Sequence, residues 1–342
     1  MKFWRSYGVF VPVLVLLALF GAYTGYWFYV AGQVETAIAI FKETPENGAP
    51  EFDYANLEIT GFPFRIEVIA DKARITAPDL EFFAERIDAN LLPYDLNHVV
   101  LQSIGRVDLN IMRRDENDRP APLAVTGAAK SFLASYIADG DGPARLDIAL
   151  NGFSGALTDA DNPPVTLSVA NAELHLRRAP DDANSSDLVA KLETLELGPG
   201  IEPVLGRMLD RVLLDARLEA LPLAAMQSGD YVRLWAASGG RANIANGQLV
   251  WGGVDIQATG IFALDAERRL NGDMDASIAG YATLLDRLYA AGRIDKNARS
   301  LLTDTLGILA RLGGGRAGIP IKFDQGRVLL GPVAIGELRP LF

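Results

Sequence analysis

Two histidines, His98 and His175, are the only imidazoles in the 342-residue chain. Either one would form a hydrolytic triad only with a serine and a carboxylate held beside it. His175 lies between Leu174 and Leu176 in an alternating pattern, so we expect it on the polar face of a strand. His98 leads into an apolar run, and we expect a structural hydrogen bond there. The pattern favours a protein that is not an enzyme, with a hydrolase using His98 or a carboxylate pair as a remote alternative.

Two short motifs resemble known catalytic or nucleotide-binding sequences. Asn151–Gly155 has the wrong spacing for a nucleophile elbow and no helix after it, so we interpret it as a turn. Gly313–Gly318 matches the glycine pattern of dinucleotide-binding loops. That loop needs a strand before it and a helix after it, whereas this segment follows a helical pattern and precedes a strand pattern. We therefore interpret it as a flexible connection.

Metal and redox chemistry have little support in the sequence. The acidic segments Asp139–Gly142 and Asp159–Asp161 lack the twelve-residue loop and closing glutamate of a calcium site, and we interpret both as solvated turns. The chain has no cysteine, which excludes disulfides, thiolate metal sites and cysteine nucleophiles. We expect no cofactor and no metal. The net charge of −11 makes nucleic acid a poor partner.

The N-terminal segment predicts how the chain is placed in the cell. Ser6–Val34 carries no charged side chain and is long enough to cross a bilayer as a helix. Lys2 and Arg5 precede it, and positive residues favour the cytoplasmic side. We expect residues 1–34 to form a cytoplasmic tip and a single transmembrane anchor in the inner membrane. The C-terminal domain would then lie in the periplasm.

A cleaved signal peptide is the alternative to an anchor. The apolar region of a signal peptide is usually shorter than this one and ends in small residues. Val30–Gly32 could serve as a cleavage site, but the tyrosines and Trp27 just before it argue against one. Aromatic rings at that position are typical of the membrane interface. A buried core helix is the third interpretation of this N-terminal segment.

The rest of the chain shows mainly the period of two that marks strands with one buried face. Val165–Leu176 changes phase in its middle, which predicts a bulge and a curved sheet. Asn246-Gly247 predicts a hairpin turn, and Gly252-Gly253 is a weaker signal for one. The other strand-like runs are Leu57–Gly61, Phe64–Val68, Val107–Met112, Arg145–Leu150, Leu192–Leu197, Asp215–Leu221, Leu270–Ile278, Ile319–Phe323 and Arg327–Leu330.

Three helices are expected beyond the anchor and a short helical stalk at Glu35–Lys42. One covers Leu223–Ala237, and two amphipathic helices follow between about residues 281 and 312. The first has an apolar face made by Tyr281, Leu284, Leu285 and Leu288, and the second has a face made by Ala298, Leu301, Leu302, Thr305, Leu309 and Leu312, which we expect to pack on the sheet. Because βαβ alternation is missing, we predict an α+β fold, mostly β, with a large curved antiparallel sheet and a few packed helices. Residues 35–221 would form a strand-rich N-terminal lobe. Residues 222–342 would form a C-terminal lobe with strands and the two amphipathic helices.

The segment Gly61–Arg65 is the most distinctive local sequence. Proline denies a ladder hydrogen bond and glycine permits an unusual backbone angle, so a bend between two strands is expected. Phe62 and Phe64 flank this bend. In one interpretation the two rings plug the end of a core. In the other they form the mouth of an apolar groove near the membrane and contact a hydrophobic ligand.

The chain resembles an uncharacterised proteobacterial family of single-anchor envelope proteins, a domain of unknown function. The anchor, Gly61–Arg65 and Pro93–His98 carry the resemblance, and it extends over nearly the whole chain. A looser similarity in the anchor and the Gly61–Arg65 bend links it to AsmA-like proteins. That similarity implies a curved β-sheet protein of the inner membrane associated with lipid traffic and envelope integrity. Further shared segments are Leu249–Trp251, Gly260, Leu264-Asp265, Gly326–Val333 and Leu338–Leu341.

We therefore expect a non-enzymatic protein that binds membrane lipid or another hydrophobic ligand in a curved β-sheet groove. Such a protein would serve envelope maintenance or lipid transport. The alternative is a structural or assembly factor that binds another envelope protein through a fully packed sheet without a cavity. A continuous apolar groove would separate the first hypothesis from the second.

Overall fold

The computed structural model describes residues 4–43, 51–77, 80–114, 120–140, 142–159, 163–223, 231–330 and 333–338. Its helices are α1 (Trp4–Glu43), α2 (Tyr231–Ala237), α3 (Tyr281–Ala290) and α4 (Lys296–Leu312). Its strands are β1 (Glu51–Asp53), β2 (Asn56–Thr60), β3 (Ile66–Ala77), β4 (Leu80–Leu92), β5 (Asp95–Arg114), β6 (Pro120–Asp139), β7 (Gly142–Asp159), β8 (Val165–Ala179), β9 (Asp182–Leu197), β10 (Met208–Glu219), β11 (Arg241–Trp251), β12 (Val254–Leu264), β13 (Leu270–Ala279), β14 (Ala317–Asp324), β15 (Arg327–Leu330) and β16 (Val333–Glu337).

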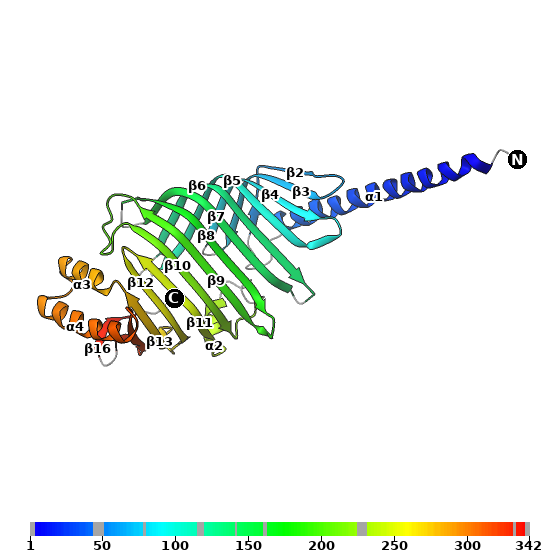
Figure 1. The fold of residues 1–342 in the computed structure, drawn as a ribbon. Helices are drawn as coiled ribbons and strands as arrows, with labels where there is room; N and C mark the ends of the chain where they lie inside the picture. Colours follow the sequence, from blue (N-terminus) through cyan, green and yellow to red (C-terminus); the bar gives the residue numbers. More distant parts are fainter. Residues whose placement is uncertain are drawn as a thin grey trace.

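All the described strands belong to one antiparallel sheet. From β3 to β16 each strand pairs with the next one in sequence, and β1 and β2 both pair with β3. The sheet is long and twisted, with α1 leaving one end and α3 and α4 packed at the other (Figure 1). The predicted class, mostly β with a long apolar N-terminal helix and few other helices, is therefore confirmed. β10 pairs with β11, so the sheet continues across the expected lobe boundary at 221/222.

The predicted phase change in β8 is present, and similar irregularities occur in its neighbours β7 and β9 and in β3. Val165, Val169 and Leu176 are all buried although their spacing changes from even to odd. Lys72 in β3 and Thr194 in β9 adopt positive φ, as does Gly152 in β7. Each irregularity shifts a strand by one residue and so returns its apolar positions to the same face.

Two turn predictions were wrong. Asn246-Gly247 lies inside β11, where Gly247 pairs with Ala258 beside a register shift, and the hairpin turn is at Gly252-Gly253 instead. Both glycines of that turn have positive φ, as the two-residue turns of hairpins require. Asn151–Gly155 is not a turn either, because the segment lies within β7. Its Gly152 marks the bulge. Of the helix expected at Leu223–Ala237, residues 231–237 form α2 and residues 224–230 lie outside the described residues.

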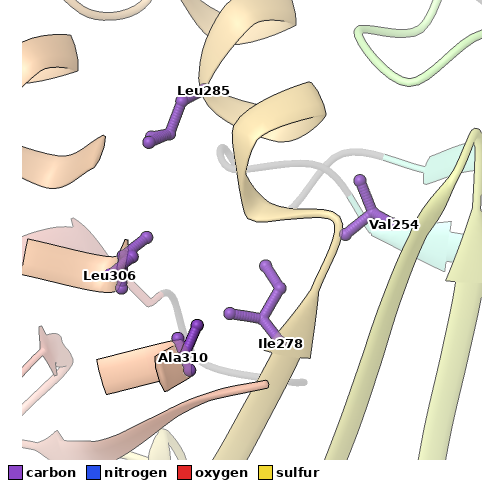
Figure 2. Packing of buried hydrophobic residues seen from close by; sticks show 6 residues of the cluster. Val254, Ile278, Leu285, Leu306 and Ala310 are labelled. Atoms are coloured by element: carbon purple, nitrogen blue, oxygen red, sulfur yellow. The ribbon is translucent and has the colours of Figure 1, made fainter. Parts of the chain in front are cut away.

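The C-terminal helices pack on the sheet through one apolar cluster. Val254 and Ile278 from the strands meet Leu285 of α3 and Leu306 and Ala310 of α4 (Figure 2). This packing fixes the buried face of α4 at Leu302, Leu306 and Ala310. The face expected from the sequence was partly wrong. Leu301 and Leu312 were expected on the packed side, and they are 67% and 82% exposed.

Helix α1 packs on the other end of the sheet through its C-terminal half. Trp27, Val30 and Ala31 are buried against Ile66 and Val68 of β3. The predicted helical stalk is confirmed, since α1 continues without interruption to Glu43.

The N-terminal part of α1 has a different character. Val11–Ile40 has a mean hydropathy of 1.7 and is long and apolar enough to cross a membrane. Only 11% of its most apolar window is buried in the protein, unlike the core helix of a soluble domain. By its length and composition this helix is suited to be a signal anchor or a signal sequence.

Candidate functional site

One face of the sheet carries rows of apolar side chains that continue from strand to strand. Because the register places one residue of each strand opposite the next, a row can be followed through the paired positions. Three adjacent rows cross the twelve strands from β3 to β14. The central row is Val68, Ala89, Leu101, Ala134, Ile148, Leu174, Ala190, Leu214, Gly247, Ala258, Ala276 and Ile319.

The two flanking rows are nearly as apolar. One is Ile66, Leu91, Val99, Tyr136, Leu146, Leu176, Leu188, Ala216, Ile244, Gly260, Met274 and Ile321. The other is Ala70, Ile87, Ser103, Phe132, Leu150, Ala172, Leu192, Val212, Leu249, Ile256, Ile278 and Ala317. We name the surface made by the three rows the apolar strip.

Helices cover the apolar strip at its two ends. Ile66 and Val68 lie under α1, and Ile278 and Ala317 lie under α3 and α4. Among the described residues, no helix is part of the hydrophobic cluster on the strands between them. Strands lie about 4.8 Å apart, so the strip from β3 to β14 is roughly 50 Å long. It joins the apolar N-terminal helix to the far end of the molecule.

The apolar face is curved beside the strip. Phe153 of β7 is only 5% exposed and Val169 of β8 only 8%, although both lie in the cluster formed by strand residues alone. Large side chains on a flat uncovered sheet would be exposed, so the sheet bends around them. In the strip itself Ile148, Leu174 and Leu214 are half-buried, and Leu176 and Ala216 are buried. Ser103 is a polar residue among the apolar residues of the strip, and its buried hydroxyl has no hydrogen-bond partner among the described residues.

The opposite face of the same strands is charged. His175 Nδ1 lies 2.8 Å from Asp147 Oδ1, and His175 Nε2 lies 3.3 Å from Glu173 Oε2. Burial alone would raise the pKa of Asp147, but hydrogen bonds from His175 and Arg145 outweigh it and leave that pKa below its ordinary value. His175 therefore lies on the polar face, as predicted, in a network of cross-strand pairs.

The His98 environment bears directly on the hydrolase alternative. His98 Nε2 lies 3.0 Å from Ser135 Oγ on the neighbouring strand β6. The expected structural hydrogen bond is therefore present, and its partner is a serine, as a hydrolase would need. Among the described residues, no carboxylate is hydrogen-bonded to His98 to complete a triad. A hollow of about 690 Å³ on this face is lined by Arg145, Asp147, His175 and their neighbours and by neither His98 nor Ser135.

The backbone around Ser135 also disfavours acyl transfer. Ser135 pairs with Val100 of β5 on one side and with Asp147 of β7 on the other. Backbone N–H groups in a central strand are used by the ladder and are not free to hold an oxyanion. The arrangement holds a cross-strand hydrogen bond, and the ladder leaves no backbone N–H of Ser135 free for a tetrahedral intermediate.

Neither ring of the Gly61–Arg65 bend belongs to the core. Phe62 is 39% exposed and stacks on Phe28 of α1 at 5.8 Å between ring centroids. Phe64 is 81% exposed, so the interpretation of both rings as a core plug does not hold for Phe64. Their role as the mouth of an apolar groove stays a prediction.

The remaining motifs show no catalytic arrangement. The glycine-rich segment runs from the end of α4 into β14 and is the expected connection. Asp139 pairs with Arg178 at 2.8 Å, and Gly140 follows it as a turn. Asp141 and residues 160–161 lie outside the described residues. Within the described parts of the chain, no group of three or more histidine or acidic side chains is arranged to hold a metal ion.

The chain belongs to the family described as an uncharacterised protein conserved in bacteria, DUF2125, whose model matches residues 27–339. The predicted resemblance to an uncharacterised bacterial family is therefore confirmed over most of the chain. The match begins at Trp27, the first residue from Val11 onward that is buried against the sheet. No curated protein matches the sequence. The looser similarity to AsmA-like proteins stays a prediction.

Proposed function

We propose that this member of the DUF2125 family is a non-enzymatic protein that holds a lipid, or a similar long hydrophobic molecule, against its apolar strip. The apolar strip is the observation that carries the proposal. Among the described residues no helix joins the hydrophobic cluster in the middle of the strip, where Ile148, Leu174 and Leu214 are half-buried. Apolar surface of this extent that stays partly exposed marks an interaction site. The occupant is a lipid rather than a compact ligand, because the strip is roughly 50 Å long and lies along a single face of the sheet.

The proposal includes a single-pass inner-membrane anchor formed by α1, with the sheet in the periplasm. Lys2 and Arg5 before the uncharged segment favour this orientation. Cleavage near Val30–Gly32 would remove Trp27 and Val30, which are 3% and 5% exposed and form part of a core cluster with the sheet. Retention of α1 is therefore favoured, because its loss would uncover Ile66.

The anchor would bring the strip next to its source of lipid. α1 packs on the strip at β3, and Ala89 and Leu91 of β4 belong to the same cluster, so the part without a helix begins at β5. A lipid leaving the outer leaflet would meet this end of the strip first. Envelope maintenance or lipid transport is the biological role that such an arrangement supports.

A matched pair of variants in β10 tests the proposal. Leu213 and Leu214 are consecutive half-buried leucines on opposite faces of the sheet. Leu214 pairs with Ala190 on the strip, and Leu213 pairs with Lys191 on the charged face. A carboxylate on the strip would oppose an acyl chain, so Leu214→Glu should lose lipid and Leu213→Glu should retain it.

The measurement is lipid extraction and mass spectrometry on the purified full chain, with far-UV circular dichroism as the folding check. If Leu214→Glu does not fold, Ala190→Trp fills the strip without adding charge, and Val189→Trp on the charged face is its control. Equal lipid content in a folded strip variant and its control would contradict the proposal. No lipid in the unmodified chain would contradict it too and would favour the assembly-factor alternative.

A further inference from the structure

Two exposed aromatic rings lie beside the point where α1 leaves the sheet. Phe64 is 81% exposed and Tyr94 is 74% exposed. Phe64 lies in the turn before β3, and Tyr94 lies in the turn between β4 and β5. Ile66 at the start of β3 pairs with Leu91 near the end of β4, so both turns lie at the same end of the strands. With the exposed Leu92 and Leu96 beside Tyr94, these rings gather apolar surface at one place, and gathered apolar surface marks a candidate interaction site.

Hydrogen bonds from side chains of α1 fix the position of both turns along the axis of this helix. The Tyr26 hydroxyl donates to the Pro93 carbonyl at 2.8 Å, and Trp27 Nε1 donates to the Arg65 carbonyl at 3.0 Å. The Tyr23 hydroxyl donates to the carbonyl of Pro63. Phe64 and Tyr94 are therefore each adjacent in sequence to a residue held at the level of Tyr23–Trp27.

The same level is where the outer face of the bilayer must lie. Trp27 is 3% exposed and packed on the sheet, so the hydrocarbon core ends before it. At about 1.5 Å per residue, the helix from Ser6 to Tyr26 is roughly 30 Å long, which matches the hydrocarbon core of a bilayer. Leu14, Leu16 and Phe20 in this stretch are more than half exposed, as lipid-facing side chains are.

We infer that Phe64 and Tyr94, flanked by the exposed Leu92 and Leu96, form a membrane foot that inserts into the outer-leaflet interface of the membrane crossed by α1. Tyrosine and phenylalanine on exposed turns gain from the boundary between headgroups and acyl chains. The foot fixes the tilt of the sheet on the membrane and holds the β4–β5 end of the apolar strip at the lipid surface. The inference depends on the proposed anchor and not on lipid binding by the strip.

The absence of cysteine allows a direct test with the full chain. Single variants Phe64→Cys and Tyr94→Cys are labelled with an environment-sensitive fluorophore and reconstituted into vesicles of phosphatidylethanolamine and phosphatidylglycerol. Part of the lipid carries a nitroxide quencher just below the headgroup. Both labels should lose fluorescence to the quencher and resist quenching by aqueous iodide.

Three control positions separate the possible failures. Leu312→Cys has the same exposure as Phe64, 82% against 81%, but lies at the end of α4 and should be quenched only by iodide. Leu16→Cys, measured in vesicles whose nitroxide lies at the end of the acyl chains, reports whether α1 is in the bilayer, because residue 16 is at the middle of the span. Leu214→Cys reports lipid on the apolar strip. The foot would be overturned if lipid quenches the label at 16 while the labels at 64 and 94, like the label at 312, are quenched only by iodide. An unquenched label at 16 would overturn the anchor and the foot together, whereas the label at 214 tests strip occupancy separately.

Discussion

Replacing Phe262 by alanine should be among the most damaging single changes in the sheet. The ring is 7% exposed and packs edge-on against Phe323 at 5.2 Å between centroids. A buried phenylalanine removes roughly 150 Å² or more of apolar surface from water, worth about 4 kcal/mol at about 25 cal/mol per Å². Emptying such a site also leaves a cavity that the sheet backbone cannot close. We expect Phe262→Ala to lower the free energy of unfolding by about 3–5 kcal/mol.

The neighbouring residue supplies the control for this measurement. Ile261 lies in the same strand but is 49% exposed, so Ile261→Ala should cost about 1 kcal/mol or less. Urea titration of the full chain in nanodiscs, followed by far-UV circular dichroism, gives both values. Trp251→Ala is a third variant in the same sheet. Trp251 is only half-buried but donates to the Gly206 carbonyl at 2.8 Å, so a loss between the two is expected. A loss below about 1 kcal/mol for Phe262→Ala would refute the assigned register.

Three further changes test separate parts of the fold. Hydrogen bonds from Arg316 and Gln248 outweigh burial and hold the pKa of Asp255 below its ordinary value. The stability from this carboxylate is therefore present above its unfolded pKa of about 3.9 and is lost as the pH falls through the lower folded value. Acid titration of Asp255→Asn should show a smaller loss of stability than the unmodified chain, and an identical curve would contradict the assignment. Gly155→Ala should unfold at lower urea than the unmodified chain, because its Cβ would lie 2.2 Å from the Thr126 carbonyl oxygen, and an unchanged midpoint would mean that the strands can separate there. His98→Ala should restore envelope integrity in a deletion strain as well as the unmodified gene does, and failure of a stable His98→Ala protein would revive the hydrolase alternative.

Local sequence was sufficient for features that depend on one segment at a time. Alternation of apolar and polar residues predicted strands because side chains of a strand point to opposite faces in turn. The phase change between Val169 and Ala172 predicted the bulge in β8 for the same reason. The uncharged run at Ser6–Val34 predicted a helix long enough to span a bilayer. In each case the physical cause lies within a few residues, so it can be read without knowing what packs nearby.

Turns and packed helix faces depended on more distant parts of the chain. Asn246-Gly247 has the right residues for a hairpin, yet pairing of β11 with β10 and β12 carries the strand through it. Leu312 has the spacing of a core residue, yet it lies beyond the point where α4 meets the sheet and is exposed. Sequence spacing gives the faces of a helix, but only its neighbours decide which face is buried.

The candidate site was decided by the tertiary structure. Alternation showed that each strand has an apolar face, and it could not show that Leu101, Ile148 and Leu214 lie in one row across the sheet. That alignment depends on the register of every strand pair and on the bulges that restore phase, and a one-residue slip would send a strand's apolar side chains to the other face. The exposure of Phe64 likewise follows from where α1 holds the bend, through hydrogen bonds between residues about 40 positions apart. The sequence determined what each segment can bury, and long-range pairing decided what stays uncovered.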